Sequence, residues 1–358
     1  MSIPASDLRY QDHILAGVSR TFALTIPELP AWLRIVVGNA YLLCRIADTV
    51  EDDPHLPVEE KQRFLRRFCR VVEGRESGEA FAAELCARLS PRASPAERDL
   101  VAHTARVVAI AHAFEAPQRA AIERCVQLMT EGMAHFQAKG GPQGLETLAD
   151  LEGYCYCVAG VVGEMLTELF CQRIPELAPR RQALQWLALS FGQGLQMTNI
   201  LKDVWEDRSR GACWLPRAVF EERGCDLGSL TPGEAGFRRG MEHLIGVARW
   251  HLERALDYTL LIPKREQGIR RFCLWALGMA VLTLANLRRR LAFHRGDQVK
   301  ISRGTVRATV TLTSVCAGSN GALRLLFRWA ARGLPPPVPP RERFVPPGWA
   351  SEPLEGGT

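Results

Sequence analysis

Residues 32–52 read WLRIVVGNAYLLCRIADTVED, an apolar run that ends in a cluster of carboxylates. The apolar positions recur at the spacing of an α-helix, which predicts a helix that continues into the acidic end. Asp48 and Asp52 stand one helical turn apart, and Glu51 lies on the same face. Because like charges at this spacing repel one another, this face suits a cation or a cation bound to phosphate.

A second acidic cluster repeats the pattern later in the chain. Asp203 and Asp207 again stand at i and i+4, with Glu206 beside them. Gln196 and Asn199 precede the cluster on the same face by helical spacing. One such cluster is typical of a solvated helix end, but two clusters, each after an apolar run, indicate carboxylates that line a cavity.

Oxygen ligands of this kind fit Mg²⁺, or Mn²⁺ in its place, shared between carboxylates and substrate phosphates. Two facing helices in a bundle would hold such ions around a diphosphate. The metal would make diphosphate a good leaving group. The allylic cation left behind would then need a dry pocket to escape capture by water.

The composition is that of a globular protein with a mildly basic surface. Of 358 residues, 47% are hydrophobic and 23% charged, with a net charge of +6. This charge favours phosphates, an anionic membrane surface or nucleic acid, although ordinary surface charge explains it as well. No aromatic–basic stripe or known nucleic-acid motif occurs, so we expect no nucleic-acid partner.

The cysteines and the chain start indicate a reducing compartment. Eleven cysteines are scattered from Cys44 to Cys316 without a CxxC pair, so we expect neither a disulfide framework nor a zinc site. The first residues lack the charged and apolar regions of a signal peptide. No stretch reaches the roughly 18–20 uninterrupted apolar residues of a membrane span. We therefore expect a cytoplasmic protein without a transmembrane segment.

Helical periodicity dominates, which predicts an all-α fold in one domain over residues 1–334. The predicted helices are Trp32–Ala47, Pro57–Val72, Ala96–Phe114, Leu148–Gln172, Arg181–Glu206, Gly236–Leu260 and Arg265–Phe293. Only Val306–Leu312 offers a short strand-like alternation.

The C-terminal region has two parts. Pro335–Thr358 contains eight prolines and few apolar anchors, which predicts a flexible or polyproline-like tail. Ala322–Arg332 before it is basic and amphipathic. This segment fits either a peripheral contact with a membrane surface or a last core helix with its polar face in water.

Four motifs, in order, resemble those of the squalene and phytoene synthase family of head-to-head prenyl transferases. Ser19–Phe22 is similar to the family's N-terminal diphosphate-binding segment, and Tyr41–Asp52 to its first acidic motif. Tyr154–Gly163, YCYCVAGVVG, resembles the central tyrosine motif, and Gln196–Asp207 the second acidic motif. The resemblance covers most of residues 15–305.

The resemblance implies an isoprenoid synthase helix bundle with a central active-site cavity. It also implies head-to-head condensation of two farnesyl diphosphates to presqualene diphosphate, in a monomeric enzyme of sterol or hopanoid biosynthesis. Phe272-Cys273 and Val299–Gly304 resemble segments of the squalene branch, which reduces the intermediate to squalene with NADPH. The family has no GxGxxG dinucleotide fingerprint, and none is expected here.

Two departures from the family pattern leave alternatives open. Lys202 stands where the family usually has arginine, which keeps a point charge for phosphate but loses bidentate geometry. Ser302 replaces a typical arginine of the NADPH-associated segment. The alternatives are a non-reducing synthase that gives dehydrosqualene, phytoene or presqualene diphosphate, and an inactive prenyl-lipid binding or scaffold protein.

The resemblance also implies the role of each candidate residue. The metal ligands would be Asp48, Glu51, Asp52, Asp203, Glu206 and Asp207. Substrate and diphosphate contacts would come from Ser19, Arg20, Phe22, Arg45, Gln196, Asn199 and Lys202. NADPH contacts would come from Arg20, Arg45, Lys202, Lys300 and Arg303. Proton transfer would fall to Tyr154 and Tyr41, and shielding of the cation to Phe22 and Phe272.

Overall fold

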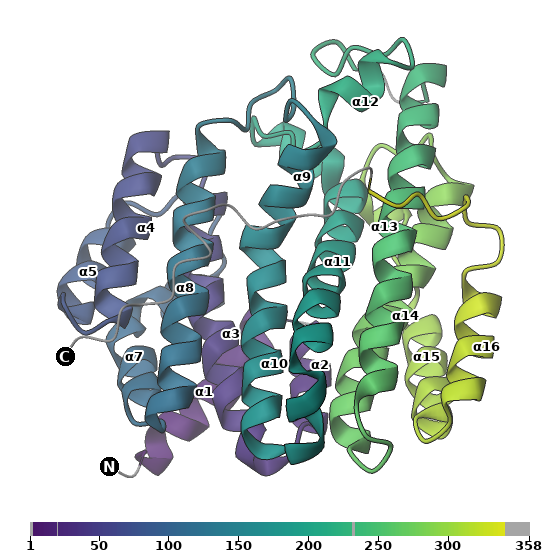
Figure 1. The fold of residues 1–358 in the computed structure, drawn as a ribbon. Coiled ribbons are helices and arrows are strands. Elements are labelled where there is room, and N and C mark those ends of the chain that lie inside the picture. Colours follow the sequence, from purple (N-terminus) through teal and green to yellow (C-terminus); the bar gives the residue numbers. More distant parts are fainter. Residues whose placement is uncertain (1–2, 20, 231–232, 341–358) are drawn as a thin grey trace. The chain divides into compact units, whose positions relative to one another are not determined.

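The structure is a computed structural model in which residues 3–19, 21–230 and 233–340 are described. Over these residues the chain is helical and contains no β-strand, only an isolated bridge between Leu145 and Pro216, which confirms the all-α prediction (Figure 1). The chain divides into two compact units. They are Met1–Ala138 with Glu168–Arg173, and Lys139–Thr167 with Ile174–Thr358.

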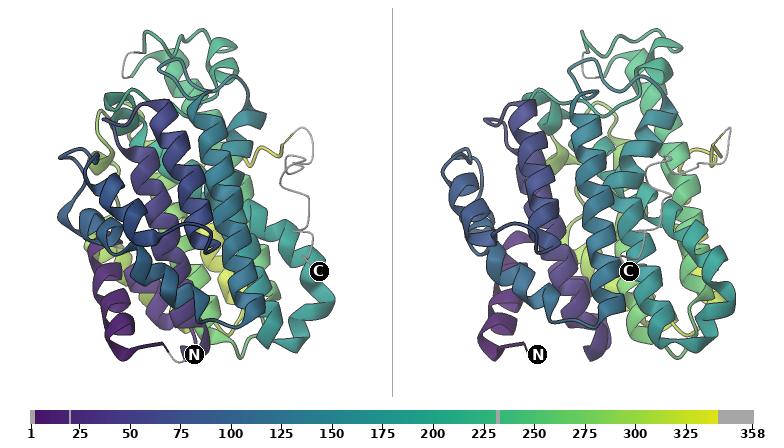
Figure 2. Two further views of the ribbon diagram at one scale, coloured as in Figure 1. Left: turned by 90° about the vertical axis from the view of Figure 1, so that its left-hand side faces the viewer. Right: turned by 60° about the vertical axis from the view of Figure 1, so that its left-hand side comes forward.

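The first unit is built around one long helix, α3. Its elements are α1 (Ala5–Val18), α2 (Thr21–Thr25), η1 (Ile26–Glu28), α3 (Ala31–Asp52), α4 (Val58–Val72), α5 (Gly78–Cys86), α6 (Pro95–Ala102), α7 (Thr104–His112) and α8 (Ala116–Gln137). Helix α3 packs against α1, α4, α6, α7 and α8. The helices of this unit are purple to blue in Figure 2. The first acidic cluster therefore lies at the end of the helix around which this unit is built.

Helix α3 follows from its sequence. Pro30 precedes its first residue, as is common at helix starts. Its buried stripe has helical spacing and comprises Leu33, Val36, Val37, Ala40, Leu43, Ala47 and Val50. Asp53 ends the helix, because its carboxylate accepts hydrogen bonds from the amides of His55 at 2.8 Å and Ser90 at 2.7 Å. The last acid of the sequence cluster therefore shapes a turn.

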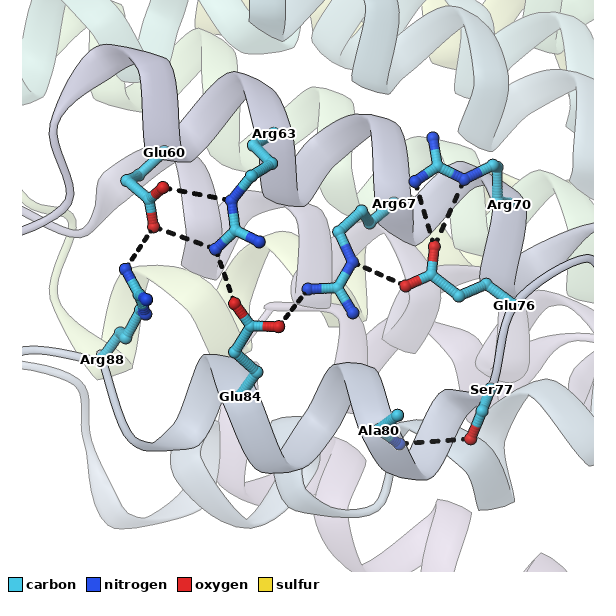
Figure 3. Close-up of polar contacts among 9 residues, drawn as sticks. All are labelled: Glu60, Arg63, Arg67, Arg70, Glu76, Ser77, Ala80, Glu84 and Arg88. Atoms are coloured by element: carbon cyan, nitrogen blue, oxygen red, sulfur yellow. Dashed lines mark hydrogen bonds and ion pairs between the residues drawn. The ribbon is translucent and has the colours of Figure 1, made fainter.

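A network of ion pairs joins α4 to α5 on the surface of the first unit (Figure 3). Arg63 contacts Glu84 at 2.7 Å, and Arg67, which is only 13% exposed, contacts both Glu84 and Glu76. Glu60 joins the network through Arg63 at 3.0 Å. Isolated surface pairs contribute about 0–1 kcal/mol, but a network held between two helices also fixes their register. These arginines are neutralised within the fold.

The helix predicted for Ala96–Phe114 is two helices, α6 and α7. The backbone turns at His103, where φ is −103° and ψ is 23°. The hydroxyl of Thr104 donates to the carbonyl of Val101 at 2.7 Å and so supports the turn. Apolar periodicity passes through this break without change, which is why the sequence predicts one helix.

The second unit is built around α11. Its elements are α9 (Leu148–Cys155), the π-helical turn η2 (Tyr156–Gly160), α10 (Val161–Arg173, whose last turns belong to the first unit), η3 (Pro175–Arg180), α11 (Arg181–Ser209), α12 (Arg217–Glu221), α13 (Ala235–Leu261), α14 (Gln267–Arg289), η4 (Gly296–Gln298), α15 (Arg303–Cys316) and α16 (Asn320–Ala330). Helix α11 packs against α9, η2, α13, α14 and η4. The second acidic cluster lies on this central helix.

The tyrosine motif folds as α9, η2 and the start of α10. A side chain at Gly192 of α11 would place its Cβ 2.4 Å from the carbonyl oxygen of Ala159, and one at Gly163 would lie 2.5 Å from that of Ala188. Only glycine allows the two segments to approach this closely. The π-turn ends at Gly160, and such turns are frequent at functional sites.

The strand-like alternation at Val306–Leu312 does not form a strand, because these residues lie within α15. Ser302 caps the helix, since its Oγ accepts the amide of Thr305 at 3.1 Å. Thr309 and Thr313 turn their hydroxyls back to carbonyls one turn earlier, at 2.8 and 2.7 Å. The β-branched residues suggested a strand, but capping and packing against α14 decide for a helix.

Two helical segments are long and apolar enough to cross a membrane by length and composition, Leu148–Arg173 and Gln267–Arg289. Their most apolar windows are 56% and 67% buried within the protein. Buried core helices have the same composition, so this finding is weak evidence for a membrane span.

The proline-rich tail is described only as far as Pro340. Its first residues lie along α13, where Arg249 donates to the carbonyl of Pro335 at 2.9 Å and the amide of Val338 donates to that of Gly246 at 3.0 Å. The prediction of a flexible tail falls mainly on residues 341–358, which lie outside the described residues.

Candidate active site

The first acidic cluster occupies the last turn of α3. Asp48 is partly covered, with 36% of its side chain exposed, Glu51 is buried, and Asp52 is exposed. Burial, with the neighbouring Asp52, raises the pKa of Asp48 to about 7 against the opposing charge of Arg45. Burial and the charges of Asp52 and Asp48 raise the pKa of Glu51 to about 8. These carboxyls crowd one another, and a divalent ion bound beside them would lower their pKa values again.

Glu51 is also tied to the surrounding fold. Its carboxylate accepts a long hydrogen bond from Gln137 of α8 at 3.4 Å, and its carbonyl accepts one from Lys61 of α4 at 2.6 Å. The first contact reaches the side chain of Glu51 from α8, and the second holds its backbone to α4. The sequence offers no signal for either contact.

Arg45 lies beside the cluster and has two acidic partners. Its guanidinium bonds directly to Glu97 of α6 and lies 3.8 Å from Asp48. The Nε of Arg45 is buried and has no hydrogen-bond partner among the described residues. The helical spacing predicts the contact with Asp48, whereas Glu97 is identifiable only as part of the Ser94–Glu97 capping box.

The N-terminal motif packs beside Tyr41 of α3. Ser19 caps the short helix α2 by accepting the amide of Phe22 at 2.9 Å. The rings of Phe22 and Tyr41 lie 5.0 Å apart, and the hydroxyl of Tyr41 donates to the carbonyl of Val18 at 3.4 Å. Burial raises the pKa of Tyr41. Arg20, predicted to bind phosphate, lies outside the described residues.

The second acidic cluster lies in the last turns of α11. Lys202 pairs with the adjacent Asp203, and Arg210 pairs with the buried Asp207. Both acids are therefore neutralised by neighbours on their own chain segment. The pair shows how lysine can replace the family's usual arginine at position 202, because its single ammonium group needs to contact only one carboxylate oxygen.

Glu206 has a different partner in the second unit. Its Oε1 accepts the backbone amide of Gly296 at 2.8 Å, and its Oε2 is buried with no hydrogen-bond partner among the described residues. A Cβ at Gly296 would lie 2.8 Å from Oδ1 of Asp203 and 2.9 Å from the carbonyl oxygen of Lys202. The turn η4 thus sits directly on the second cluster, a contact that the sequence does not signal.

Gln196 and Asn199 stand on α11 at helical spacing before Asp203, as predicted. Asn199 is exposed and Gln196 half-buried. Their amides make no hydrogen bond that ties them to another described residue. They are available to a ligand on the face that carries the acidic cluster.

Tyr154 is buried at the end of α9. Its ring stacks on Trp214, with centroids 3.9 Å apart and planes within 8°. The sequence predicts a role for Tyr154, but only the structure shows that Trp214 fixes its ring. A stacked ring keeps one orientation, as a proton-transfer group requires.

The remaining predicted residues lie on α14 and at the start of α15. Phe272 is buried, with only 6% of its surface exposed, so it contributes to the core of the second unit. Lys300 and Arg303 are exposed and form no ion pair with another described residue. Ser302 between them caps α15. The free amides and cations at this helix N-terminus fit an anion such as the phosphates of NADPH.

The carboxylate oxygens of the two clusters are the type of ligand that Mg²⁺ prefers. Among the described residues, no group of three or more His, Cys, Asp or Glu side chains is already gathered at metal-binding distance. Magnesium usually binds one or two carboxylates together with substrate phosphates and water, so a preformed cage is not required. The unsatisfied Oε2 of Glu206 and the crowded carboxyls of Asp48 and Glu51 are the oxygen donors such an ion would use.

These features define an all-α protein with two carboxylate clusters suited to metal-bound diphosphate. The family model described as squalene/phytoene synthase matches residues 15–305, and the chain belongs to this family.

Among curated proteins, the chain is 31% identical to squalene synthase ERG9 of Gibberella zeae over 83% of its own length and 63% of that relative. It is also 31% identical to squalene synthase 1 of Arabidopsis thaliana, over 86% of this chain and 72% of that protein. The chain is 30% identical to the squalene synthase of Schizosaccharomyces pombe, over 85% of its own length and 65% of that protein. The chain thus spans about two thirds of the length of these relatives.

Solved structures have the same fold. TcSQS, solved with a ligand, matches with a TM-score of 0.72 and 26% identity, covering 92% of this chain and 98% of that one. A dehydrosqualene synthase matches with a TM-score of 0.61 and 22% identity, covering 86% of this chain and 94% of that one. The isoprenoid synthase helix bundle predicted from the sequence is therefore confirmed.

Proposed function

We propose that the protein is a squalene synthase. It would join two farnesyl diphosphates head to head to presqualene diphosphate and reduce this intermediate to squalene. The observation that carries the proposal is the pair of intact carboxylate clusters, on α3 and on α11, in a chain about 30% identical to several squalene synthases. A scaffold protein would have no physical need to keep crowded carboxyls such as Asp48 and Glu51.

Each cluster would bind Mg²⁺ together with a diphosphate. The proposed ligands are Asp48, Glu51, Asp52, Asp203, Glu206 and Asp207. When bound, the metal supplies Lewis-acid stabilisation of the departing diphosphate. Lys202 and Arg210 would move from Asp203 and Asp207 toward the phosphate oxygens as the metal takes the carboxylates.

The first cluster has its own cation for the phosphate. Arg45, with one buried and unsatisfied N–H, would contact the diphosphate while Glu97 keeps the guanidinium in place. Ser19 and Arg20 would add donors from the N-terminal segment. At the second cluster, Gln196 and Asn199 would supply donors from α11. Their task is to orient the leaving group.

Aromatic side chains would handle the carbocation and its proton. Tyr154, held by its stack on Trp214, would accept or relay the proton lost as the cyclopropane forms. Tyr41 would share this role, and its partner Phe22 would shield the cation. Phe272 would do the same from the core of the second unit.

The reductive step is proposed on the exposed cations before α15. Lys300 and Arg303, with the amides at the N-terminus of this helix, would hold the phosphates of NADPH, which supplies hydride when bound. Arg20, Arg45 and Lys202 are further proposed contacts for its phosphates. One observation favours a non-reducing synthase as second candidate: Ser302 caps α15 where the family usually has arginine.

Metal dependence of turnover tests the proposal. Pyrophosphate release from farnesyl diphosphate should require Mg²⁺ and should fall by about 10²–10³ in Asp48→Asn or Asp203→Asn, as for the loss of one electrostatic contact to a developing charge. Asp12→Asn, at an exposed position of α1, is the matched control and should keep full activity. Turnover that survives Asp48→Asn combined with Asp203→Asn would refute the metal assignment.

We propose further that the protein is monomeric and cytoplasmic and contacts a membrane surface peripherally. A hydrocarbon such as squalene partitions into lipid, so a location beside a bilayer suits the reaction.

A further inference from the structure

Helices α15 and α16 lie side by side at the edge of the second unit (Figure 1), and both expose apolar side chains. Leu312 and Val315 of α15 are 47% and 81% exposed, and Leu325 and Trp329 of α16 are 62% and 64% exposed. These four are more exposed than Leu24, Trp32 and Val58, the other large exposed apolar residues of the described chain. We name these four residues the docking face. Such a concentration marks an interaction surface, whereas single exposed apolar residues are normal.

An apolar pocket opens beside the docking face. It has a volume of about 160 Å³ and lies between α14, α15 and α16, lined by Leu277, Val281, Ala308, Leu326 and Phe327 among others. No charged residue lines it. Leu312 and Trp329 belong both to its lining and to the docking face, so the pocket meets the surface there. It is a suitable recess for a hydrocarbon chain.

The charge around the docking face has one sign. Residues 298–340 contain six basic residues and no acidic one. The exposed Arg324 and Arg328 stand one turn apart on α16 next to Leu325 and Trp329, and the exposed Arg332 follows just after the helix; we call these three residues the arginine stripe.

The arginine stripe is only partly neutralised. Arg324 lies 3.3 Å from Asp257 of α13, but this carboxylate is shared with Arg254 at 2.9 Å. Arg328 and Arg332 form no ion pair with any residue in the described part of the chain. The surface therefore keeps positive charge beside its apolar side chains.

We propose that the docking face binds the surface of an anionic lipid bilayer. Trp329 and Leu325 would enter the headgroup region, where an indole ring is favoured, while Arg328 and Arg332 contact lipid phosphates. The apolar side chains of α15, which the sequence pattern of α16 alone does not reveal, would widen the inserted surface.

The charge argues against a second copy of this chain as the occupant. Two identical faces brought together would place arginine stripes near one another with no acids between residues 298 and 340 to offset them. An anionic bilayer has the complementary charge and adapts to the shape of the apolar side chains. The inference rests on the peripheral membrane contact proposed above and names the surface that makes it, but it does not depend on the proposed reaction.

Co-sedimentation with vesicles tests the inference on the full-length protein. The protein should bind vesicles made of equal parts phosphatidylglycerol and phosphatidylcholine, and should bind pure phosphatidylcholine far more weakly. Binding should weaken when salt shortens the screening length from about 10 Å to about 3 Å. Arg328→Glu combined with Arg332→Glu should lower the partition constant by about 25-fold or more, since each basic residue contributes about fivefold.

Apolar insertion has its own variants and controls. Trp329→Ser should lower partitioning by about tenfold through lost burial. Arg66→Glu and Trp32→Ser, at exposed positions of the first unit, are the matched controls and should bind as the wild type does. Far-UV circular dichroism and melting curves of each variant check that it folds.

Three results would overturn the inference. The first is equal binding to neutral and anionic vesicles. The second is unchanged binding of both the arginine double variant and Trp329→Ser, with each variant folded. The third is a dimer, seen by sedimentation velocity without lipid, that Trp329→Ser dissociates, because a second copy would then occupy the docking face.

Discussion

The backbone amide of Gly296 donates a 2.8 Å hydrogen bond to Oε1 of Glu206. This contact fastens the turn that leads to Lys300 and Arg303 onto the second acidic cluster. The other carboxylate oxygen of Glu206 is buried and has no hydrogen-bond partner in the described part of the chain. One carboxylate thus supports the fold with one oxygen and can bind a cation with the other.

Replacing Gly296 by alanine should disturb both the cluster and the segment after it. The new Cβ would meet Oδ1 of Asp203 at 2.8 Å and backbone at 2.9 Å, so a helix or the turn must shift. We expect a loss of about 1–3 kcal/mol in the free energy of unfolding, as for overpacked sites, and a raised KM for both farnesyl diphosphate and NADPH. Urea unfolding and steady-state kinetics measure the two effects.

Gly318→Ala is the matched control for this change. Gly318 lies after α15 and is exposed, and a Cβ there would meet nothing within 4 Å. It should alter neither stability nor KM appreciably. Equal behaviour of the two alanine variants would show that η4 does not depend on the close approach at Gly296.

Tyr154→Phe separates catalysis from packing. The phenylalanine ring keeps the stack on Trp214 but lacks the hydroxyl. We expect turnover to fall by about 10²–10⁴, the usual contribution of a proton-transfer group. The free energy of unfolding should change by about 0.5–1.5 kcal/mol, the net value of one hydrogen bond.

Tyr156→Phe provides the comparison. Tyr156 is fully buried, and its hydroxyl donates to Glu164 at 3.3 Å. This variant should lose similar stability while turnover stays near that of the wild type. A similar loss of turnover in both variants would assign the effect of Tyr154 to the motif as a whole and contradict a specific role in proton transfer.

Arg270 is a fully buried arginine that joins three helices. Its guanidinium donates to the carbonyl of Ile262, after the end of α13, at 3.1 Å and to the side chain of Asn320, at the start of α16, at 2.6 Å. A cation at a helix C-terminus is favourable. Arg270→Met should lower the free energy of unfolding by about 2–5 kcal/mol, because the buried carbonyl of Ile262 and the half-buried side chain of Asn320 lose their donor.

Arg271→Met, one position along α14 and only partly covered, is the control and should cost far less. Chemical denaturation of both variants measures the difference. If the two substitutions cost the same, the buried contacts of Arg270 do not hold α13 and α16 to α14.

The raised pKa values of Asp48, about 7, and Glu51, about 8, predict how metal binding depends on pH. Without metal, these carboxyls hold protons that the unfolded chain releases above about pH 4.5, so their contribution to stability falls as the pH rises toward 8. Mg²⁺ needs the ionised carboxylates. Magnesium should therefore raise the melting temperature more at about pH 8 than at about pH 6.

Scanning fluorimetry with Mg²⁺ and inorganic pyrophosphate measures this dependence. Asp48→Asn combined with Glu51→Gln, which removes both titrating groups, should abolish most of the difference between the two pH values. An equal magnesium effect at both pH values in the wild type would contradict the assignment of these carboxyls as ligands.

Much of the fold is predictable because α-helical periodicity survives in the sequence. The long helices α3, α11, α13 and α14 lie where the apolar spacing places them. The helix Ala116–Gln137 is not predicted, because its apolar positions are interrupted by charged and polar residues, and contacts with α4 and α3 decide its place. The π-turn after α9 is likewise set by packing against α11.

The residues of the candidate site likewise fall into those that the sequence reveals and those that only the structure reveals. The acidic clusters and Tyr154 are visible in the sequence because their residue types and spacing carry the chemistry. The contacts made by Gly296, Glu97 and Trp214 are not visible there, because each joins a partner far away in the chain. Long-range contacts of this kind depend on how helices meet, which spacing within one helix does not encode.

Product analysis with labelled cofactor tests the central claim most directly. The purified protein is incubated with farnesyl diphosphate and Mg²⁺, with and without NADPH carrying deuterium at the transferred position, and the lipids are analysed by mass spectrometry. The account predicts deuterium-labelled squalene that forms only when the cofactor is present. Dehydrosqualene, phytoene or presqualene diphosphate as the sole product in both samples would contradict it.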